Sequence, residues 1–250
     1  MHFSREILLT RMATATAVLV SVSLCLSQPL TPAEALDRYL APPGDRKSSC
    51  SDSVFTVQID ATMPKLHKEG SMNGLKLVSR TGQVIYRGLQ FTGDRLIKTA
   101  VIARFLANDT NPMARTDDLA VSRQNYWFVY DKTSDYNGKT AFVFFLKPRR
   151  KRAGLFRGEL WLAADTGAPL RLWGDLVKSP SIFVRSFRFV QDYMTLGGCS
   201  QPLRLLLTTR TRIVGEVEMV VWQHAAHDAP EATEGGASAF DFQNRGHTSR

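Results

Sequence analysis

The residues best suited to bind an anion are five cations within six positions of the segment KPRRKR: Lys147, Arg149, Arg150, Lys151 and Arg152. Such a run can bind nucleic-acid phosphates, face an anionic membrane surface, or form the solvated turn of a β-hairpin. Apolar, strand-like segments stand on both sides of it, so the hairpin loop is the structural prediction. Which anion it meets depends on the compartment of the protein.

A second candidate for chemistry is Asp165, which opens the tetrad Asp165-Thr166-Gly167-Ala168 that is the signature of aspartic proteases. That chemistry needs two carboxylates about 3 Å apart that share one proton. The chain has one such tetrad, so a homodimer would have to supply the second carboxylate. The competing interpretation is a turn between two strands, because Asp, Thr and Gly are also turn residues.

Other combinations of catalytic or metal-binding residues are weak. His224 and His227 form a His-x-x-His pair, but they stand where the last predicted strand ends, and no third ligand is evident. The sequence contains no Gly-x-Ser-x-Gly, no P-loop and no Gly-rich dinucleotide turn. We therefore expect a protein that is not an enzyme and that needs neither a metal nor a cofactor.

The N-terminus predicts export. Arg5 and Arg11 precede an uncharged run of 16 residues, 12–27, and small residues there suit cleavage before Gln28. The run is short for a spanning helix, which needs about 20 residues, yet a retained anchor is an alternative. Lipidation at Cys25 is another alternative to simple cleavage. Residues 1–27 are thus predicted to be a signal peptide, and the protein to be periplasmic or secreted.

Export determines how the net charge and the cysteines are interpreted. The net charge of +9 then points to an anionic membrane surface or an acidic envelope polymer and not to nucleic acid. Cys50 and Cys199 form an even pair in an oxidising compartment, which predicts a disulfide. It would close a loop of about 150 residues and contribute up to ~4–5 kcal/mol. Residues 28–225 are long enough for one domain, and the Gly/Ala/Glu-rich residues 226–250 are predicted to be a disordered tail.

Between these ends the sequence predicts two helices and many strands. A helix begins after Thr31, with Glu34 completing a capping box, and a second follows Asp94 over residues 95–109. The remaining segments alternate with period two and are bounded by turn residues, which predicts a long antiparallel meander. A sheet this wide must curl. The predicted fold is mainly β: a strongly curved antiparallel sheet, or unclosed β-barrel, of about 10–11 strands with a helical lid on the concave face.

Some of these strands carry more large apolar side chains than two short helices can cover. The segment TAFVFFLK is apolar on both faces. The alternation of the last strand directs four apolar residues inward: Ile213, Val217, Met219 and Val221. An ordinary core is one explanation. The other is an apolar cavity under the lid, and its predicted lining residues are Phe144, Leu160, Leu162 and Phe187.

The order of these elements resembles the LolA/LolB-type lipoprotein-carrier superfamily. The resemblance spans residues 31–223 and rests on the first helix TPAEALDRYL, the strand segment VFTVQIDATMPKLHKEGSMNGLKLV and the hairpin series that ends in ADTGAPLRL. It implies an unclosed β-barrel with a helical lid over an apolar cavity that holds acyl chains. No single lid-locking residue of that superfamily can be placed on this sequence.

Two functions follow as expectations. The first is a non-enzymatic periplasmic carrier or binder of lipid or lipoprotein acyl chains, which meets an anionic membrane surface through the basic loop. The second is an envelope sensor or interaction module of the same fold that binds a partner protein. An aspartic protease that uses Asp165 is a remote third.

Overall fold

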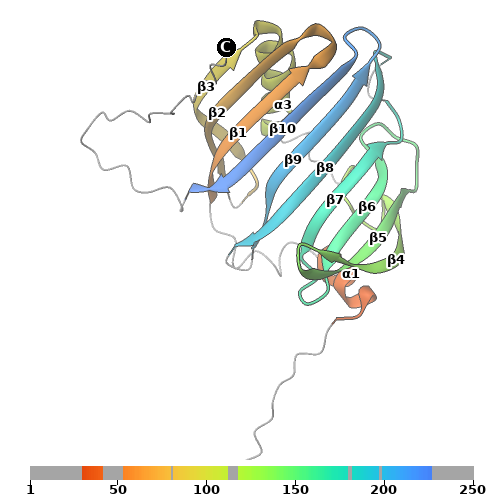
Figure 1. The fold of residues 1–250 in the computed structure, drawn as a ribbon. Coiled ribbons are helices and arrows are strands. Elements are labelled where there is room, and N and C mark those ends of the chain that lie inside the picture. The colour runs from red at the N-terminus through yellow and green to blue at the C-terminus, as the bar shows by residue number, and fades with distance from the viewer. Residues whose placement is uncertain are drawn as a thin grey trace, which may run out of the picture.

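The computed structural model describes residues 30–41, 53–79, 81–111, 118–179, 182–196 and 199–226. Within these ranges there are three helical segments, ten strands and one short 3₁₀ turn, η1 (Figure 1). Their bounds are α1 Pro32–Leu40, β1 Ser53–Met63, η1 Pro64–Leu66, β2 Lys68–Val78, β3 Val84–Gly93, η2 Ile97–Ile102, α3 Ala103–Thr110, β4 Tyr126–Tyr136, β5 Lys139–Pro148, β6 Phe156–Ala163, β7 Pro169–Leu176, β8 Val184–Leu196, β9 Cys199–Thr211 and β10 Glu216–Ala225.

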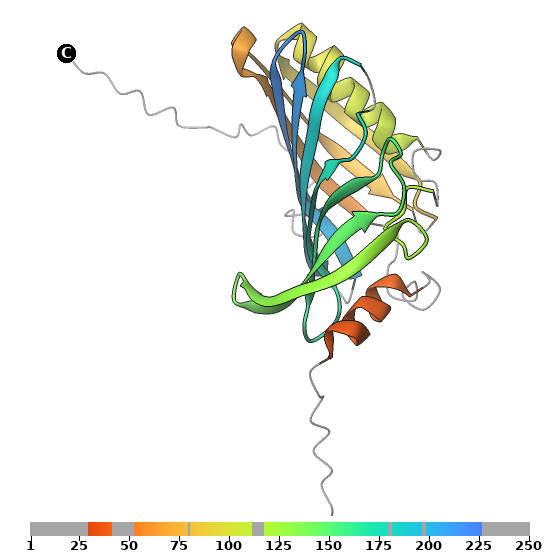
Figure 2. The same cartoon turned by 90° about the vertical axis from the view of Figure 1, so that its right-hand side faces the viewer.

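All ten strands form one antiparallel sheet in the order β3-β2-β1-β10-β9-β8-β7-β6-β5-β4. The sheet curves strongly, and β3 and β4 remain at opposite edges, so it does not close (Figures 1 and 2). The predicted unclosed antiparallel barrel of about ten strands is confirmed. The predicted single meander is wrong in one respect: β1 pairs with β10, with Ile59 opposite Val221, and this joins two meanders that are far apart in the sequence.

Helix α1 begins as its sequence predicts. The backbone N–H of Thr31 donates to Glu34 Oε2 at 2.8 Å, and the N–H of Glu34 donates to Thr31 Oγ1 at 3.3 Å. These bonds form a capping box, which satisfies donors that the first helical turn leaves open. The helix lies against the β6–β7 turn at Gly167, where a Cβ would come within 2.9 Å of the Ala35 carbonyl oxygen.

The second predicted helix is also confirmed, and it forms as two consecutive segments, η2 and α3. Asp94 precedes it and accepts the N–H of Leu96 at 2.7 Å and the ammonium of Lys68 at 3.0 Å. Segment η2 is a π-helix, and α3 continues it to Thr110. It packs closely on β2 at Gly70, where a Cβ would lie 3.0 Å from Ile97 Cγ2.

Both helical regions lie on the same, concave side of the sheet, but over different halves of it (Figure 2). Helix α1 packs on β6, whereas η2 packs on β1, β2 and β3. Each covers a separate apolar core. The α1 cluster consists of Leu30, Ala35, Leu36, Tyr126, Phe142, Phe144, Leu146, Leu155, Phe156, Leu160, Leu162, Ala164 and Leu172. The η2 cluster consists of Phe55, Val57, Ile59, Ala61, Met63, Met72, Ile97, Ile102, Leu106, Met219 and Val221.

The opposite, outer face of the sheet carries a network of charged side chains around Asp192 in β8. Its carboxylate accepts hydrogen bonds from Arg171 at 2.7 Å, from Arg204 at 2.7 Å and from the hydroxyl of Tyr136 at 2.8 Å. Burial alone would raise the pKa of Asp192, but these hydrogen bonds and the two nearby charges outweigh it and hold the pKa below its ordinary value. The network thus joins β4, β7, β8 and β9 across the middle of the sheet.

Several predictions concern residues that the structure does not describe. Residues 1–27, Cys50 and residues 227–250 lie outside the described ranges. Cys199 is disulfide-bonded, and its partner is outside those ranges. The signal peptide, the disordered tail and the Cys50–Cys199 pairing therefore stay predictions.

Candidate functional site

An apolar pocket of about 620 Å³ lies on the concave side, between the η2–α3 region and the middle of the sheet. Its volume falls within the range of about 300–1,000 Å³ that is usual for small-molecule sites. The described residues that line it are Met63, Leu96, Ala100, Val101, Arg104, Phe105, Asn108, Phe187, Leu205, Leu207, Thr209, Thr211, Val214, Val217 and Met219.

The pocket exists because β8 and β9 lie between the two covered halves of the sheet. Neither α1 nor the η2–α3 region packs extensively on these strands. Alternate residues of β9, from Leu205 to Thr211, face the pocket, and they remain partly exposed instead of being buried. Leu206, between two of them, points to the outer face and pairs with Val220 and Val190.

The wall of the pocket is almost entirely hydrocarbon. Among its described lining residues, Arg104 of α3 is the single charged one, and Asn108, Thr209 and Thr211 are the polar ones. The Arg104 side chain is exposed to solvent. The pocket therefore suits an apolar chain, with a cation at its border that could pair with an anionic group.

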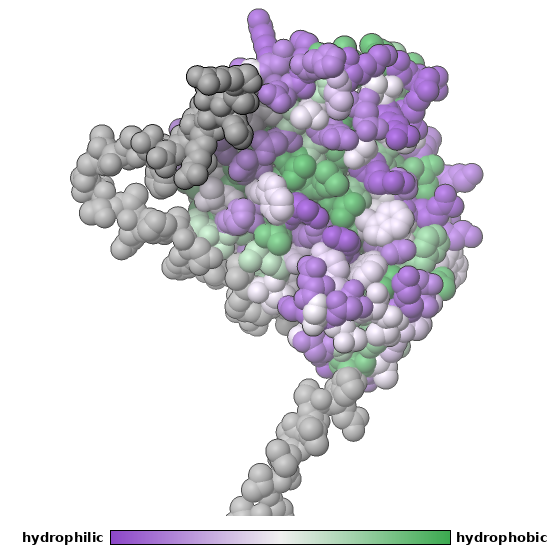
Figure 3. All heavy atoms as spheres, viewed as in Figure 1, coloured by the Kyte–Doolittle hydropathy of each residue, from purple (hydrophilic) through white to green (hydrophobic). Residues whose placement is uncertain are grey.

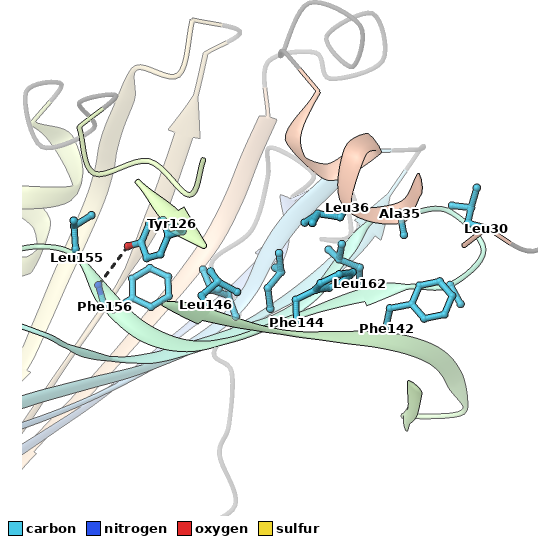
Figure 4. Close-up of a cluster of buried hydrophobic side chains, with 13 residues drawn as sticks. Leu30, Ala35, Leu36, Tyr126, Phe142, Phe144, Leu146, Leu155, Phe156 and Leu162 are labelled. Carbon is cyan, nitrogen blue, oxygen red and sulfur yellow. Dashed lines mark hydrogen bonds between the residues drawn. The ribbon is translucent and has the colours of Figure 1, made fainter. Parts of the chain in front are cut away.

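The four predicted cavity residues do not lie together. Phe187 lines the pocket. Phe144, Leu160 and Leu162 are not among its lining residues and lie in the α1 cluster, where each is buried. Figure 4 shows Phe144 and Leu162 beneath Leu36 of α1. The reason is the position of α1: it covers β5 and β6, so their inward side chains fill a packed core.

The cluster under α1 has one polar anchor. Tyr126 is buried, and its hydroxyl accepts the N–H of Phe156 at 3.3 Å (Figure 4). Burial raises the pKa of Tyr126 to about 12. Its ring lies 5.1 Å from that of Phe156, which in turn packs edge-on against Phe189 of β8. The described side chains of this half of the concave face thus form a packed core.

Sequence reasoning missed most of the pocket wall. Val217 and Met219 of β10 were predicted to point inward and both line the pocket, whereas Leu205 and Leu207 were missed because β9 was interpreted only as a strand. A signal was present in the run Leu205-Leu206-Leu207, which places apolar side chains on both faces of one strand. Ile213, predicted to point inward, lies instead in the β9–β10 turn and is 68% exposed.

The basic segment forms the loop between β5 and β6, as predicted, and all five cations are exposed. Two of them have partners. The guanidinium of Arg149 stacks on the ring of Trp127 at 3.4 Å, and Arg152 forms an ion pair with Asp118 at 2.8 Å. Lys147, Arg150 and Lys151 take part in no ion pair with a described residue. They are therefore available to bind an external anion.

Charge reversal at Arg150 and Lys151 is expected to weaken binding to anionic vesicles and to leave the melting temperature nearly unchanged. Each cation near an anionic surface contributes ~1 kcal/mol, and neither side chain stabilises the fold through an ion pair. Vesicle cosedimentation and thermal unfolding measure the two effects. Charge reversal at Arg149, which also loses the stacking on Trp127, is the comparison. A large loss of stability in the Arg150 and Lys151 variant would contradict this assignment.

The two weaker motifs fall at exposed positions. Asp165 lies in the β6–β7 turn, where its carboxylate accepts a hydrogen bond from the Thr166 hydroxyl at 3.1 Å, as the turn interpretation predicts. His224 is exposed on β10 and stacks on Trp222, and His227 lies outside the described residues. Within the described ranges, no group of three or more His, Cys, Asp or Glu side chains could hold a metal ion.

Comparisons with known proteins give similarity in structure alone. No protein-family model matches the chain, and no curated protein matches its sequence. A LolA superfamily protein from Nitrosomonas europaea is 12% identical with a TM-score of 0.35, covering 78% of this chain and 92% of that one. A domain described as an outer membrane lipoprotein-sorting protein, from Vibrio parahaemolyticus, is 13% identical with a TM-score of 0.39, covering 80% and 94%.

A complex of MucA and MucB from Pseudomonas aeruginosa contains a third similar chain, 12% identical with a TM-score of 0.24, covering 78% of this chain and 93% of that one. Solved structures similar to this chain thus include the superfamily that its sequence resembles. Among the described helices, none has the length and apolar character to cross a membrane.

Proposed function

We propose that the chain is a non-enzymatic periplasmic protein that binds an acyl chain of a lipid or lipoprotein and acts in envelope lipid or lipoprotein trafficking. The observation that carries the proposal is the apolar pocket between the η2–α3 region and strands β8–β10. Its wall offers hydrocarbon contacts along Leu205, Leu207 and Val217 and few hydrogen-bonding groups. A ligand that fits such a wall is a chain of methylene groups.

The energetics favour enclosure for such a ligand. An acyl chain gains about 0.8 kcal/mol for each CH₂ group that leaves water, so a sixteen-carbon chain gains roughly 12 kcal/mol in total. An exposed surface patch could supply a small part of this. A concave pocket covers the chain on several sides and recovers much more. The exposed guanidinium of Arg104 would pair with the anionic end of the ligand at the pocket border.

The affinity of the Leu207→Asp variant for a fluorescent fatty-acid probe, compared with that of the wild type, tests this function. The substitution places a carboxylate against the acyl chain, where it has no hydrogen-bond partner, so we expect probe affinity to fall at least about tenfold. The matched control is Leu206→Asp, which changes the adjacent residue of β9 on the opposite face. It should bind the probe like the wild type. Equal affinity of Leu207→Asp and wild type would reject the pocket as the acyl site.

A second candidate function is the interaction module, which one observation favours. Strand β4 is an edge of the sheet, and Trp127, Val129 and Tyr130 on it are exposed. An exposed edge can accept an added strand from a partner protein. A wild-type protein that binds no fatty-acid probe, but captures an extended peptide through β4, would support this function over the first.

A further inference from the structure

One end of the sheet brings together loops that are far apart in the sequence; we call it the loop end. It comprises η1, residues 149–155, residues 177–179 with 182–183, and the β9–β10 turn, residues 212–215. Successive loops contact one another. Val177 donates its N–H to the Leu155 carbonyl at 3.0 Å, and Arg212 donates to the Phe183 carbonyl at 2.9 Å. The loop end is at the top in Figure 1.

Large apolar side chains lie at the tips of these loops and point into solvent. Ile182 is 78% exposed, Ile213 is 68% exposed and Phe183 is 54% exposed. Leu66 of η1 and Leu96, just before η2, are exposed to a smaller degree. The hydrogen bond between Arg212 and Phe183 holds these two loops side by side, so their exposed apolar tips lie at the same end of the sheet.

Cations surround these tips. The exposed cations of the loop end that form no ion pair with a described residue are Lys65, Arg150, Lys151, Lys178, Arg185 and Arg212. Two nearby carboxylates are paired, Asp94 with Lys68 and Glu216 with Arg210, whereas Glu69 is exposed and forms no ion pair with a described residue. In Figure 3 the top of the molecule is mostly hydrophilic, with apolar residues between. The loop end therefore combines a positive field with protruding apolar side chains.

We propose that the loop end docks on an anionic lipid surface, with Ile182, Phe183 and Ile213 inserted among the acyl chains. A protein interface places its apolar residues in a centre depleted of charge. Here the cations alternate with separate apolar tips, which matches a layer of anionic headgroups above hydrocarbon. The occupant that fits this pattern is a membrane.

The apolar pocket reaches the same end of the sheet. Leu96, Thr211 and Val214 line it, and Val214 is next to Ile213. Docking would therefore bring the mouth of the pocket to the bilayer, where an acyl chain can pass between the two without crossing water. This second step rests on the proposed acyl-binding function, whereas docking itself does not.

The experiment is flotation of the purified chain with vesicles of phosphatidylglycerol and phosphatidylcholine, or of phosphatidylcholine alone. The variant I182S/I213S removes two inserted apolar side chains and should bind mixed vesicles at least about tenfold more weakly than the wild type. The control V54S/I85S makes the same apolar-to-serine change at the opposite end of the sheet, where Val54 is 42% and Ile85 43% exposed. It should bind like the wild type. Wild-type-like binding of I182S/I213S would overturn the proposal, as would an equal loss in the control.

Charge gives an independent test. Arg212→Gln should weaken binding to the mixed vesicles about fivefold and leave the weak binding to phosphatidylcholine unchanged. Wild-type protein that binds neither kind of vesicle would also overturn the proposal and would leave a protein partner as the occupant.

A labelled variant keeps the test valid if I182S/I213S does not fold. A polarity-sensitive fluorophore on Ile213→Cys should brighten with mixed vesicles, and a label that stays in water contradicts insertion. Fatty-acid probe binding without vesicles separates the two proposals. If I182S/I213S still binds the fatty-acid probe but no longer binds vesicles, the acyl-binding proposal and the docking proposal are both supported. If the wild type binds vesicles through the tips but binds no probe, docking stands and acyl binding fails.

Discussion

Leu160→Ala is expected to lower the free energy of unfolding by about 2–5 kcal/mol. Leu160 is fully buried in the α1 cluster, and its truncation removes hydrocarbon contacts and leaves a cavity that the neighbouring strands cannot fill. Leu207→Ala is expected to lower it by roughly 1 kcal/mol, since Leu207 borders a space that already lacks protein atoms on one side. Urea unfolding of both variants measures the difference.

This pair of substitutions separates a packed core from a pocket. Both remove the same atoms from the concave face of one sheet, so the difference reports only on what surrounds them. Phe187→Ala extends the comparison, because Phe187 also lines the pocket and should cost clearly less than a packed phenylalanine, which costs about 3–5 kcal/mol. Equally severe losses at Leu160 and Leu207 would mean that the pocket closes into a solid core in solution.

Asp192→Asn is expected to lower the free energy of unfolding by about 1.5–3 kcal/mol at neutral pH. The substitution removes the charge that Arg171 and Arg204 share, and both guanidiniums remain about one-third exposed, so the cost stays below that of a fully buried pair. Thermal unfolding at neutral pH measures this loss. Asp165→Asn, at an exposed turn, is the control and should change stability by less than about 0.5 kcal/mol.

The same side chain predicts a pH dependence. The pKa of Asp192 is lowered in the folded protein, so its contribution is complete above the unfolded-state pKa of about 3.9 and is lost as the pH falls through the folded-state pKa. The stabilities of wild type and Asp192→Asn should therefore converge in acid. Curves that stay parallel from pH 7 down to the acid limit would show that the carboxylate charge does not stabilise the fold.

Local patterns in the sequence predict the elements well. The Thr31 and Glu34 capping box, the Asp94 start of the second helix and the period-two strands all depend on interactions between near neighbours. They therefore leave a clear signal in the sequence. The basic loop is predictable for the same reason, because a charged, Pro-containing run between apolar strands can hardly be anything but exposed.

The position of the pocket depends on long-range packing, which the sequence does not display. Pairing of β1 with β10 decides that η2 covers one half of the sheet, and the contact of α1 with Gly167 decides that it covers the other. Phe144 and Leu160 then become core, whereas Phe187 faces the open middle. All three look alike as apolar residues in alternating strands.

The exposure of the loop tips could not be predicted from the sequence pattern either. Ile213 continues the apolar alternation of β10 in the sequence, but the strand begins only at Glu216, and the preceding residues turn. Gly215 has a φ of +81°, which a residue with a side chain adopts only with strain, and this fixes the turn there. A single glycine thus changes a predicted inward residue into an exposed one.

Native mass spectrometry of the protein, purified gently from the cells that make it, tests acyl binding most directly. The acyl-binding account predicts a one-to-one complex with a lipid or acylated species in wild-type protein and in Leu206→Asp, and its loss from Leu207→Asp. A wild-type protein that carries no acyl mass, and that takes up none when fatty acid is added, would contradict it.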